Sequence, residues 1–83
     1  MEEKVIIIFN MVKRKTVVDL EIPLDITVIE LLNALNNAFE LGVDVSDVKQ
    51  CYLKMENPIA LMKGNNLISE YGIRNGSIIN FTE

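Results

Sequence analysis

The sequence predicts an α+β fold in which a mixed sheet of four to five strands packs on one long amphipathic helix. Three observations support this class: two strand-like segments open the chain, one segment with helical periodicity follows, and short strand-like segments fill the second half. The chain has 83 residues, no internal repeat and no linker-like tract. We therefore expect one domain over residues 1–83, which buries about 60 to 65% of the surface that the unfolded chain exposes.

The N-terminal part is expected to form a β-hairpin. Residues 4–10 (KVIIIFN) are rich in β-branched side chains, and residues 17–23 (VVDLEIP) alternate apolar with acidic side chains. A polar connection over residues 11–16 (MVKRKT) joins these two strands. Pro23 has no amide hydrogen to donate, so strand pairing should end there.

The helix that follows begins with a specific local signal. Thr27 precedes Glu30 by three residues, which fits a capping box: the Thr27 side-chain oxygen accepts from the Glu30 amide, and the Glu30 carboxylate accepts from the Thr27 amide. Ile26 and Leu31 occupy the two positions of a hydrophobic staple. We expect a helix of about fourteen residues that ends with Gly42 as a left-handed cap.

This helix is expected to have an apolar side and a polar side. The apolar side contains the residues that recur at helical spacing: Val28, Leu31, Leu35, Ala38 and Phe39. The polar side contains Asn33, Asn36, Asn37 and Glu40. Because alanine is a better helix former than asparagine, replacing the exposed Asn36 by alanine should change stability little or increase it.

The second half is expected to supply the remaining strands. Residues 48–55 (VKQCYLKM) predict a third strand, and an Asn-Pro turn separates it from a short strand at residues 59–62 (IALM). A tight Asn-Gly turn at residues 75–76 precedes a last strand at residues 77–81 (SIINF). The expected order is strand, strand, helix, strand, short strand, strand.

Composition excludes several classes of function. The chain has no histidine and one cysteine, so zinc sites and Cys/His or Ser/His catalysis are not expected. The formal net charge is −4, and residues 16–48 contain no lysine or arginine, which argues against a broad nucleic-acid surface. No apolar run approaches the roughly 20 residues that cross a bilayer. The N-terminus is acidic, unlike a secretory signal, so we expect a soluble, cytoplasmic protein without direct membrane insertion.

Few residues are candidates for chemistry. Two carboxylate pairs, Asp44 with Asp47 and Glu2 with Glu3, could act as acid and base, but both lie in polar segments that we expect to be exposed. The four glycines are scattered and fit turns or caps, not a phosphate-binding loop. We therefore assign no catalytic, metal-binding or cofactor-binding residue and expect no enzyme activity and no cofactor.

Two further features have a structural and a functional interpretation. The basic cluster Lys13-Arg14-Lys15 fits a solvated hairpin tip, with docking to an acidic partner or a membrane surface as the alternative. Cys51 fits a small strand residue, with a redox thiol as the alternative.

Three segments resemble ubiquitin-like proteins, whose fold is the β-grasp. They are residues 16–22 (TVVDLEI), residues 27–35 (TVIELLNAL) and residues 67–81 (LISEYGIRNGSIINF). Within that superfamily the chain length, the KVIIIFN segment and the Asn-Gly turn resemble the YukD-like proteins. These are small bacterial proteins associated with the type VII (WXG-protein) secretion system of Gram-positive bacteria. The resemblance implies a non-catalytic protein-interaction module, an accessory or regulatory component of such a system, in which the Tyr71 hydroxyl ties down a neighbouring loop.

The resemblance also raises two alternatives. Ubiquitin-like modifiers and sulfur carriers end in a flexible Gly-Gly tail whose carboxylate is adenylated, whereas this sequence ends INFTE and contains no Gly-Gly pair. The first alternative is therefore a modifier or carrier that has lost its reactive tail, and we expect no thioester or adduct at Glu83. The second is a domain separated from a larger protein, against which the initial methionine argues.

A partner-binding face is predicted from strand alternation. If Val5, Ile7 and Phe9 face the helix, Ile6 and Ile8 face the other side of the sheet, since side chains alternate with a period of two. The predicted outer patch consists of Ile6, Ile8, Val17 and Ile78. Clustered apolar residues outside a core are typical of interaction sites, so we predict that the patch binds a protein partner, such as a secretion-system component, or a second copy. The alternative is that these β-branched residues only favour strand formation.

The prediction of an outer patch depends on a core that is already filled. The expected inward set comprises Val5, Ile7, Phe9, Val18, Leu20, Ile22, Val28, Leu31, Leu35, Phe39, Ile68, Ile73, Ile79 and Phe81. This set is large enough for a chain of this size, so polar residues would suffice on the outer face.

Overall fold

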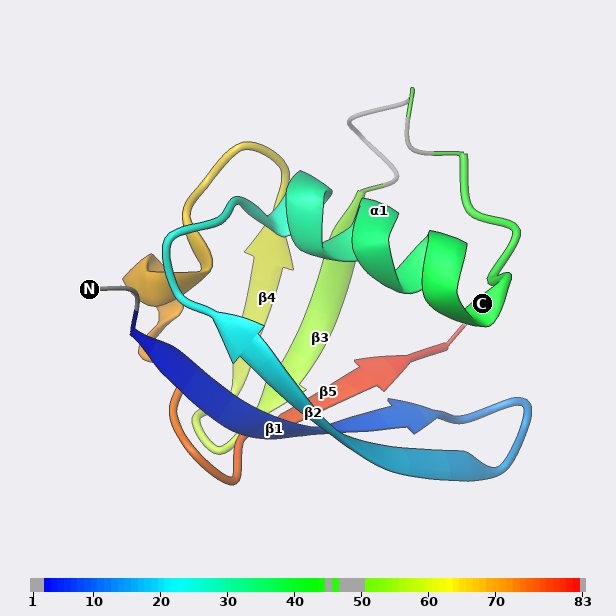
Figure 1. Ribbon diagram of the computed structural model, residues 1–83, viewed down its shortest axis with the longest axis horizontal. Helices are drawn as coiled ribbons and strands as arrows, with labels where there is room; N and C mark the ends of the chain where they lie inside the picture. Colours follow the sequence, from blue (N-terminus) through cyan, green and yellow to red (C-terminus); the bar gives the residue numbers. More distant parts are fainter. Residues whose placement is uncertain (1–2, 45, 47–50, 83) are drawn as a thin grey trace.

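The computed structural model describes residues 3–44, 46 and 51–82, and in them a five-stranded mixed sheet is covered on one face by a helix (Figure 1). The elements follow in the order β1 (Lys4–Met11), β2 (Thr16–Pro23), α1 (Val28–Phe39), β3 (Tyr52–Glu56), β4 (Ala60–Lys63), the 3₁₀ turn η2 (Ile68–Tyr71) and β5 (Ile78–Phe81). The α+β class and the predicted order of strands and helix are confirmed. Of the predicted third strand, residues 48–50 lie outside the described residues.

The sheet has the order β2-β1-β5-β3-β4. β1 pairs antiparallel with β2 and parallel with β5, and β3 pairs antiparallel with both β5 and β4. The central strand β5 and its neighbour β1 therefore come from opposite ends of the chain, as Figure 1 shows in red and blue. In the hairpin the last paired residues of the strands are Lys4 and Pro23, but the Leu24 amide still donates to the Glu3 carbonyl at 3.0 Å, so hydrogen bonding does not end at Pro23 as expected.

The first turn of α1 has the predicted capping box. The Glu30 amide donates to Thr27 Oγ1 at 3.1 Å, and the Thr27 amide donates to Glu30 Oε1 at 3.3 Å. The next two amides, of Val28 and Ile29, donate to carbonyl oxygens of the loop after β4, at Asn66 and Gly64, both at 3.0 Å. All four amides that a helix leaves without an internal acceptor are thus paired.

The loop after β4 is itself held by Tyr71 at the end of η2. Its hydroxyl accepts from the Lys63 amide at 3.0 Å and from Asn66 Nδ2 at 2.8 Å. This contact is the one that the resemblance implied for Tyr71. The helix start, the end of β4 and η2 are therefore fixed to one another.

The end of α1 differs from the prediction. The helix has 12 residues and ends at Phe39, and Glu40 takes the left-handed conformation with a φ of 53°. The expected helix of about fourteen residues with Gly42 as its cap is therefore wrong, although Gly42 also has a positive φ of 74°. Arg14, from the tip of the β1–β2 hairpin, donates to the carbonyl oxygens of Phe39 and, at 2.6 Å, of Glu40. A cation on these last carbonyls stabilises a helix end that no glycine closes.

Asn36 also differs from its expected role. It is partly buried, its Nδ2 donates to the Val43 carbonyl at 3.0 Å, and its Oδ1 accepts from the Val43 amide at 3.1 Å. Replacing Asn36 by alanine would leave both backbone groups of Val43 without this partner, so in place of a neutral or stabilising change we now expect a destabilising one.

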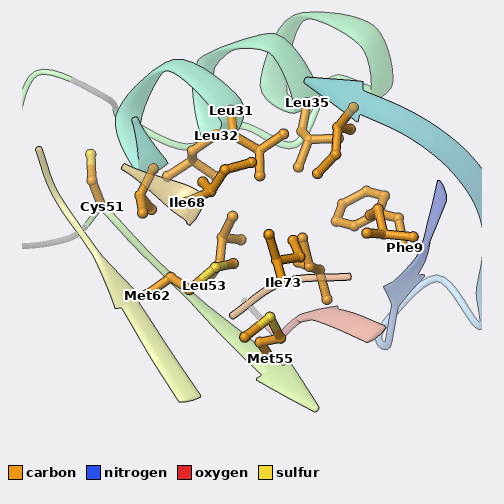
Figure 2. Packing of buried hydrophobic residues seen from close by; sticks show 14 of the residues in the cluster. Phe9, Leu31, Leu32, Leu35, Cys51, Leu53, Met55, Met62, Ile68 and Ile73 are labelled. Carbon is orange, nitrogen blue, oxygen red and sulfur yellow. The ribbon is translucent and has the colours of Figure 1, made fainter. Parts of the chain in front are cut away.

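The core lies between α1 and the inner face of the sheet (Figure 2). Every residue of the expected inward set is buried or packs partly buried against the core. The structure adds buried residues to that set: Met11, Leu32, Leu41, Cys51, Leu53, Met55 and Met62. Ala38, predicted on the apolar side of the helix, is exposed. The buried side of α1 includes Leu32 and is therefore centred farther from Ala38 than predicted.

The capping box gives the first testable prediction. Thr27→Ala removes the acceptor for the Glu30 amide, so it should lower the free energy of unfolding by about 1 kcal/mol. Asn33→Ala, at an exposed position of the same helix, is the matched control and should change stability by less than about 0.5 kcal/mol. Urea unfolding followed by circular dichroism measures both, and equal midpoints for wild type and Thr27→Ala would contradict the capping role.

Arg14 gives the second prediction. Arg14→Met keeps an apolar stem but removes both hydrogen bonds to the end of α1, so it should destabilise the protein by about 1 kcal/mol. Lys13→Met, at the neighbouring exposed residue, should cost less because the structure shows no such contact for it among the described residues. Hydrogen exchange of the Glu40 and Leu41 amides should accelerate in Arg14→Met alone. Unchanged exchange there would show that Arg14 does not hold the helix end.

Candidate protein-interaction face

The outer patch lies on the sheet face that α1 does not cover. Ile7 and Phe9 are fully buried beneath the helix, whereas Ile6 is 52% exposed and Ile8 is half-buried. The parallel pairing of β1 with β5 places Ile8 directly beside Ile78, which is also half-buried. The side chains of β1 thus face as strand alternation predicts, while partner binding by the patch stays a prediction.

Val17 belongs to the same face but lies at the side of the cluster. It is 59% exposed, and it pairs with Asn10, whereas Ile8 pairs with Asp19. Val17 and Ile8 are therefore diagonal neighbours, at roughly 7–8 Å between their Cα atoms. Asn10 in turn donates through Nδ2 to Asn80 Oδ1 at 2.9 Å. The structure brings Ile6, Ile8 and Ile78 together and leaves Val17 at the edge, next to a polar pair.

The turn before β5 holds the outer patch in place. The Ile6 amide donates to Asn75 Oδ1 at 2.8 Å, and the Ile6 carbonyl accepts from the Gly76 amide at 2.9 Å. Gly76 has a φ of 88°, in the region that favours glycine at such a turn. The buried Ser77 anchors the turn from below, since its hydroxyl donates to the Asn57 carbonyl at 2.8 Å. The amide and the carbonyl of Ile6 are therefore both bonded to the turn before β5.

Other apolar residues on the outer face were missed. Tyr52 and Leu61 are 46% and 44% exposed. Tyr52 and Leu61 lie on β3 and β4, where they pair with Lys63 and Lys54. Their positions follow from alternation with the buried Leu53 and Met62, and the same rule applied to the third and fourth strands would have found them.

Charged side chains surround the apolar residues of this face. Asp19 and Glu21 of β2 flank Ile8 and Ile6 on one side, and Glu56 of β3 flanks Ile78 on the other. An apolar centre with a charged, exposed rim is the usual anatomy of a protein–protein interface.

The described residues hold little that could perform chemistry. Among them no three His, Cys, Asp or Glu side chains come together as a metal site would need. Asp44 is exposed, and the amide and hydroxyl of Ser46 donate to its carboxylate, which lowers the pKa of Asp44. Its predicted partner Asp47 lies outside the described residues, as does Glu2 of the other pair. No helix of the described chain is long and apolar enough to cross a membrane.

The two ambiguous features of the sequence have structural roles. Cys51 is 1% exposed and packs in the core, an environment typical of an inert, space-filling cysteine. In the basic cluster Arg14 is engaged by the end of α1, and Lys13 and Lys15 remain exposed. The cluster is therefore neither a purely solvated tip nor a three-charge docking site.

Comparison with known proteins agrees with this architecture. The fold is similar to that in the solution structure of the C-terminal ubiquitin-like domain of mouse tubulin-specific chaperone e, with a TM-score of 0.70 and 14% sequence identity over 99% of this chain and 90% of that chain. At this identity the likeness concerns the fold alone. No curated protein matches the sequence. The family described as WXG100 protein secretion system (Wss), protein YukD, matches residues 6–80, and the chain, with its ubiquitin-like β-grasp fold, belongs to that family.

Proposed function

We propose that the protein is a non-catalytic, cytoplasmic interaction module, an accessory or regulatory component of a bacterial type VII (WXG100) secretion system that binds a protein partner through the outer patch. Membership of the YukD family supports the link to secretion. The observation that carries the binding role is the exposure of Ile6 beside the Ile8–Ile78 pair, on a face that the helix leaves uncovered.

Exposure of these side chains is not required by the fold. Ile7, Phe9 and Ile79 are fully buried, so the inner face supplies the core without help from the outer face. Polar residues could occupy the outer positions, as Asn10 and Asn80 do. The isoleucines at positions 6, 8 and 78 expose apolar surface to water. Burying that surface in an interface would stabilise a complex by about 25 cal/mol per Å² of apolar area.

The chemistry of the face also limits the partner. Asp19, Glu21 and Glu56 border the three isoleucines, while Lys54 lies farther along β3, paired with Asn80. A partner would therefore present an apolar centre with lysine or arginine near its rim. The charged rim would set orientation and association rate more than affinity.

The outer patch gives the third prediction. Ile6→Lys, in the chromosomal copy of the source bacterium, should reduce export of small WXG proteins into the medium as far as deletion of the gene does, because a charge replaces the most exposed isoleucine of the patch. Leu61→Lys is the matched control, since Leu61 is a similarly exposed apolar residue of the same sheet face. Immunoblots of cells and medium measure export and the level of each variant.

The outcomes separate the two parts of the proposal. Both variants should accumulate to wild-type level, and only Ile6→Lys should lose export. If Ile6→Lys exports normally while deletion does not, the contact surface lies elsewhere. If deletion leaves export unchanged, the role in secretion is wrong.

A further inference from the structure

A second apolar surface lies between β2 and α1, away from the outer patch. It is a groove of about 440 Å³ whose walls include Leu20 and Ile22 of β2 and Leu31, Ala34 and Ala38 of α1. Ala34 and Ala38 are exposed on the flank of the helix. Their small side chains leave the apolar wall of the groove accessible from solvent, where larger residues at these positions would cover it.

β2 borders this groove as an edge strand of the sheet. The hairpin ladder continues past its last paired residues, because the Leu24 amide donates to the Glu3 carbonyl at 3.0 Å. Hydrogen-bonded pairs alternate along an antiparallel ladder. Counting back from Leu24 in steps of two, Ile22, Leu20 and Val18 therefore form their backbone hydrogen bonds with β1. The backbone N–H and C=O groups of Val17, Asp19 and Glu21 therefore point to the open side of β2, where another strand can pair with them.

The charges along this edge have one sign. Residues 16–40 include five carboxylates and no lysine or arginine, and Asp19, Glu21, Asp25 and Glu30 are exposed there. Lys4 approaches Glu21 from β1 at 3.9 Å, a long, exposed ion pair that is worth little. Among the described residues, Arg14 also lies near the end of α1 that borders the groove, but its guanidinium is held by the carbonyls there.

This charge distribution selects the occupant. Pairing of β2 with β2 of a second copy would set Asp19 and Glu21 against carboxylates of the other chain, which is unfavourable. A basic strand would instead place lysine or arginine beside them. Because side chains alternate, the inward side chains of an added strand would enter the groove and its outward side chains would lie next to Asp19 and Glu21.

We propose that the β2–α1 groove binds an extended segment of a protein partner in which apolar residues alternate with lysine or arginine. The segment adds to β2 as a sixth strand, bonded to the backbone of Val17, Asp19 and Glu21. Its apolar side chains fill the space beside Ala34 and Ala38, and its basic side chains neutralise the acidic edge. This mode of recognition combines backbone pairing for affinity with alternate side-chain contacts for specificity.

Selection from a random-peptide display library against the immobilised full-length chain tests the proposal. Enriched peptides should show alternation of apolar and basic residues over at least one strand length. Addition of a synthetic enriched peptide should slow hydrogen exchange at the Val17, Asp19 and Glu21 amides. Enrichment of peptides without this pattern, no enrichment, or protection confined to other amides would each overturn the assignment.

A matched pair of variants locates the binding site. Ala34→Trp fills the groove and should weaken peptide binding by about tenfold or more, a change of about 1.4 kcal/mol. Asn33→Trp adds the same side chain at the adjacent exposed position, which does not line the groove, and should leave affinity unchanged. Equal affinity of Ala34→Trp and wild type for the peptide would refute the proposal. So would a dimer, detected by sedimentation, that protects the same β2 amides.

Discussion

The first turn of α1 has four backbone amides for which the helix itself offers no carbonyl acceptor. The groups that accept hydrogen bonds from these amides connect the helix to the rest of the structure. Two of the acceptors are the side chains of Thr27 and Glu30, and two are the carbonyls of Gly64 and Asn66 in the loop after β4. The hydroxyl of Tyr71 holds that loop. The helix is thereby fixed at its N-terminal end on the β3–β4 half of the sheet. Its other end is fixed on the β1–β2 half by Arg14.

The elements that the sequence predicted correctly depend on neighbours along the chain. The capping box needs only Thr27 and Glu30, which lie three residues apart in the sequence. The end of α1 was wrong because its cap comes from elsewhere. Arg14 lies more than twenty residues before the carbonyls that it binds, and Asn36 bonds to a loop residue beyond the helix. A left-handed conformation at Glu40, rarely adopted by residues other than glycine and asparagine, is retained where such contacts favour it.

The part of the candidate site that follows from the alternation of side chains along a strand could be predicted from the sequence. Alternation gave the facing of Ile6 and Ile8 without any knowledge of the tertiary structure. It could not give the register between β1 and β2, so Val17 was expected beside Ile8 and instead pairs with Asn10. The β2–α1 groove was beyond sequence reasoning for a further reason. Its opening depends on which flank of the helix Ala34 and Ala38 occupy, and that is set by burial of Leu32.

The central place of β5 has a consequence for how the chain folds. In the sheet order the β1–β2 hairpin and the β3–β4 hairpin pair only through β5, which follows both of them in the sequence. The contact between β1 and β5 joins residues about seventy positions apart, as from Ile8 to Ile78, and such long-range pairing slows folding. During synthesis, both hairpins leave the ribosome before the strand that joins them. The nascent chain therefore exposes the edges of β1 and β3 until Ile78–Phe81 emerges, an interval in which a chaperone or a premature partner could bind.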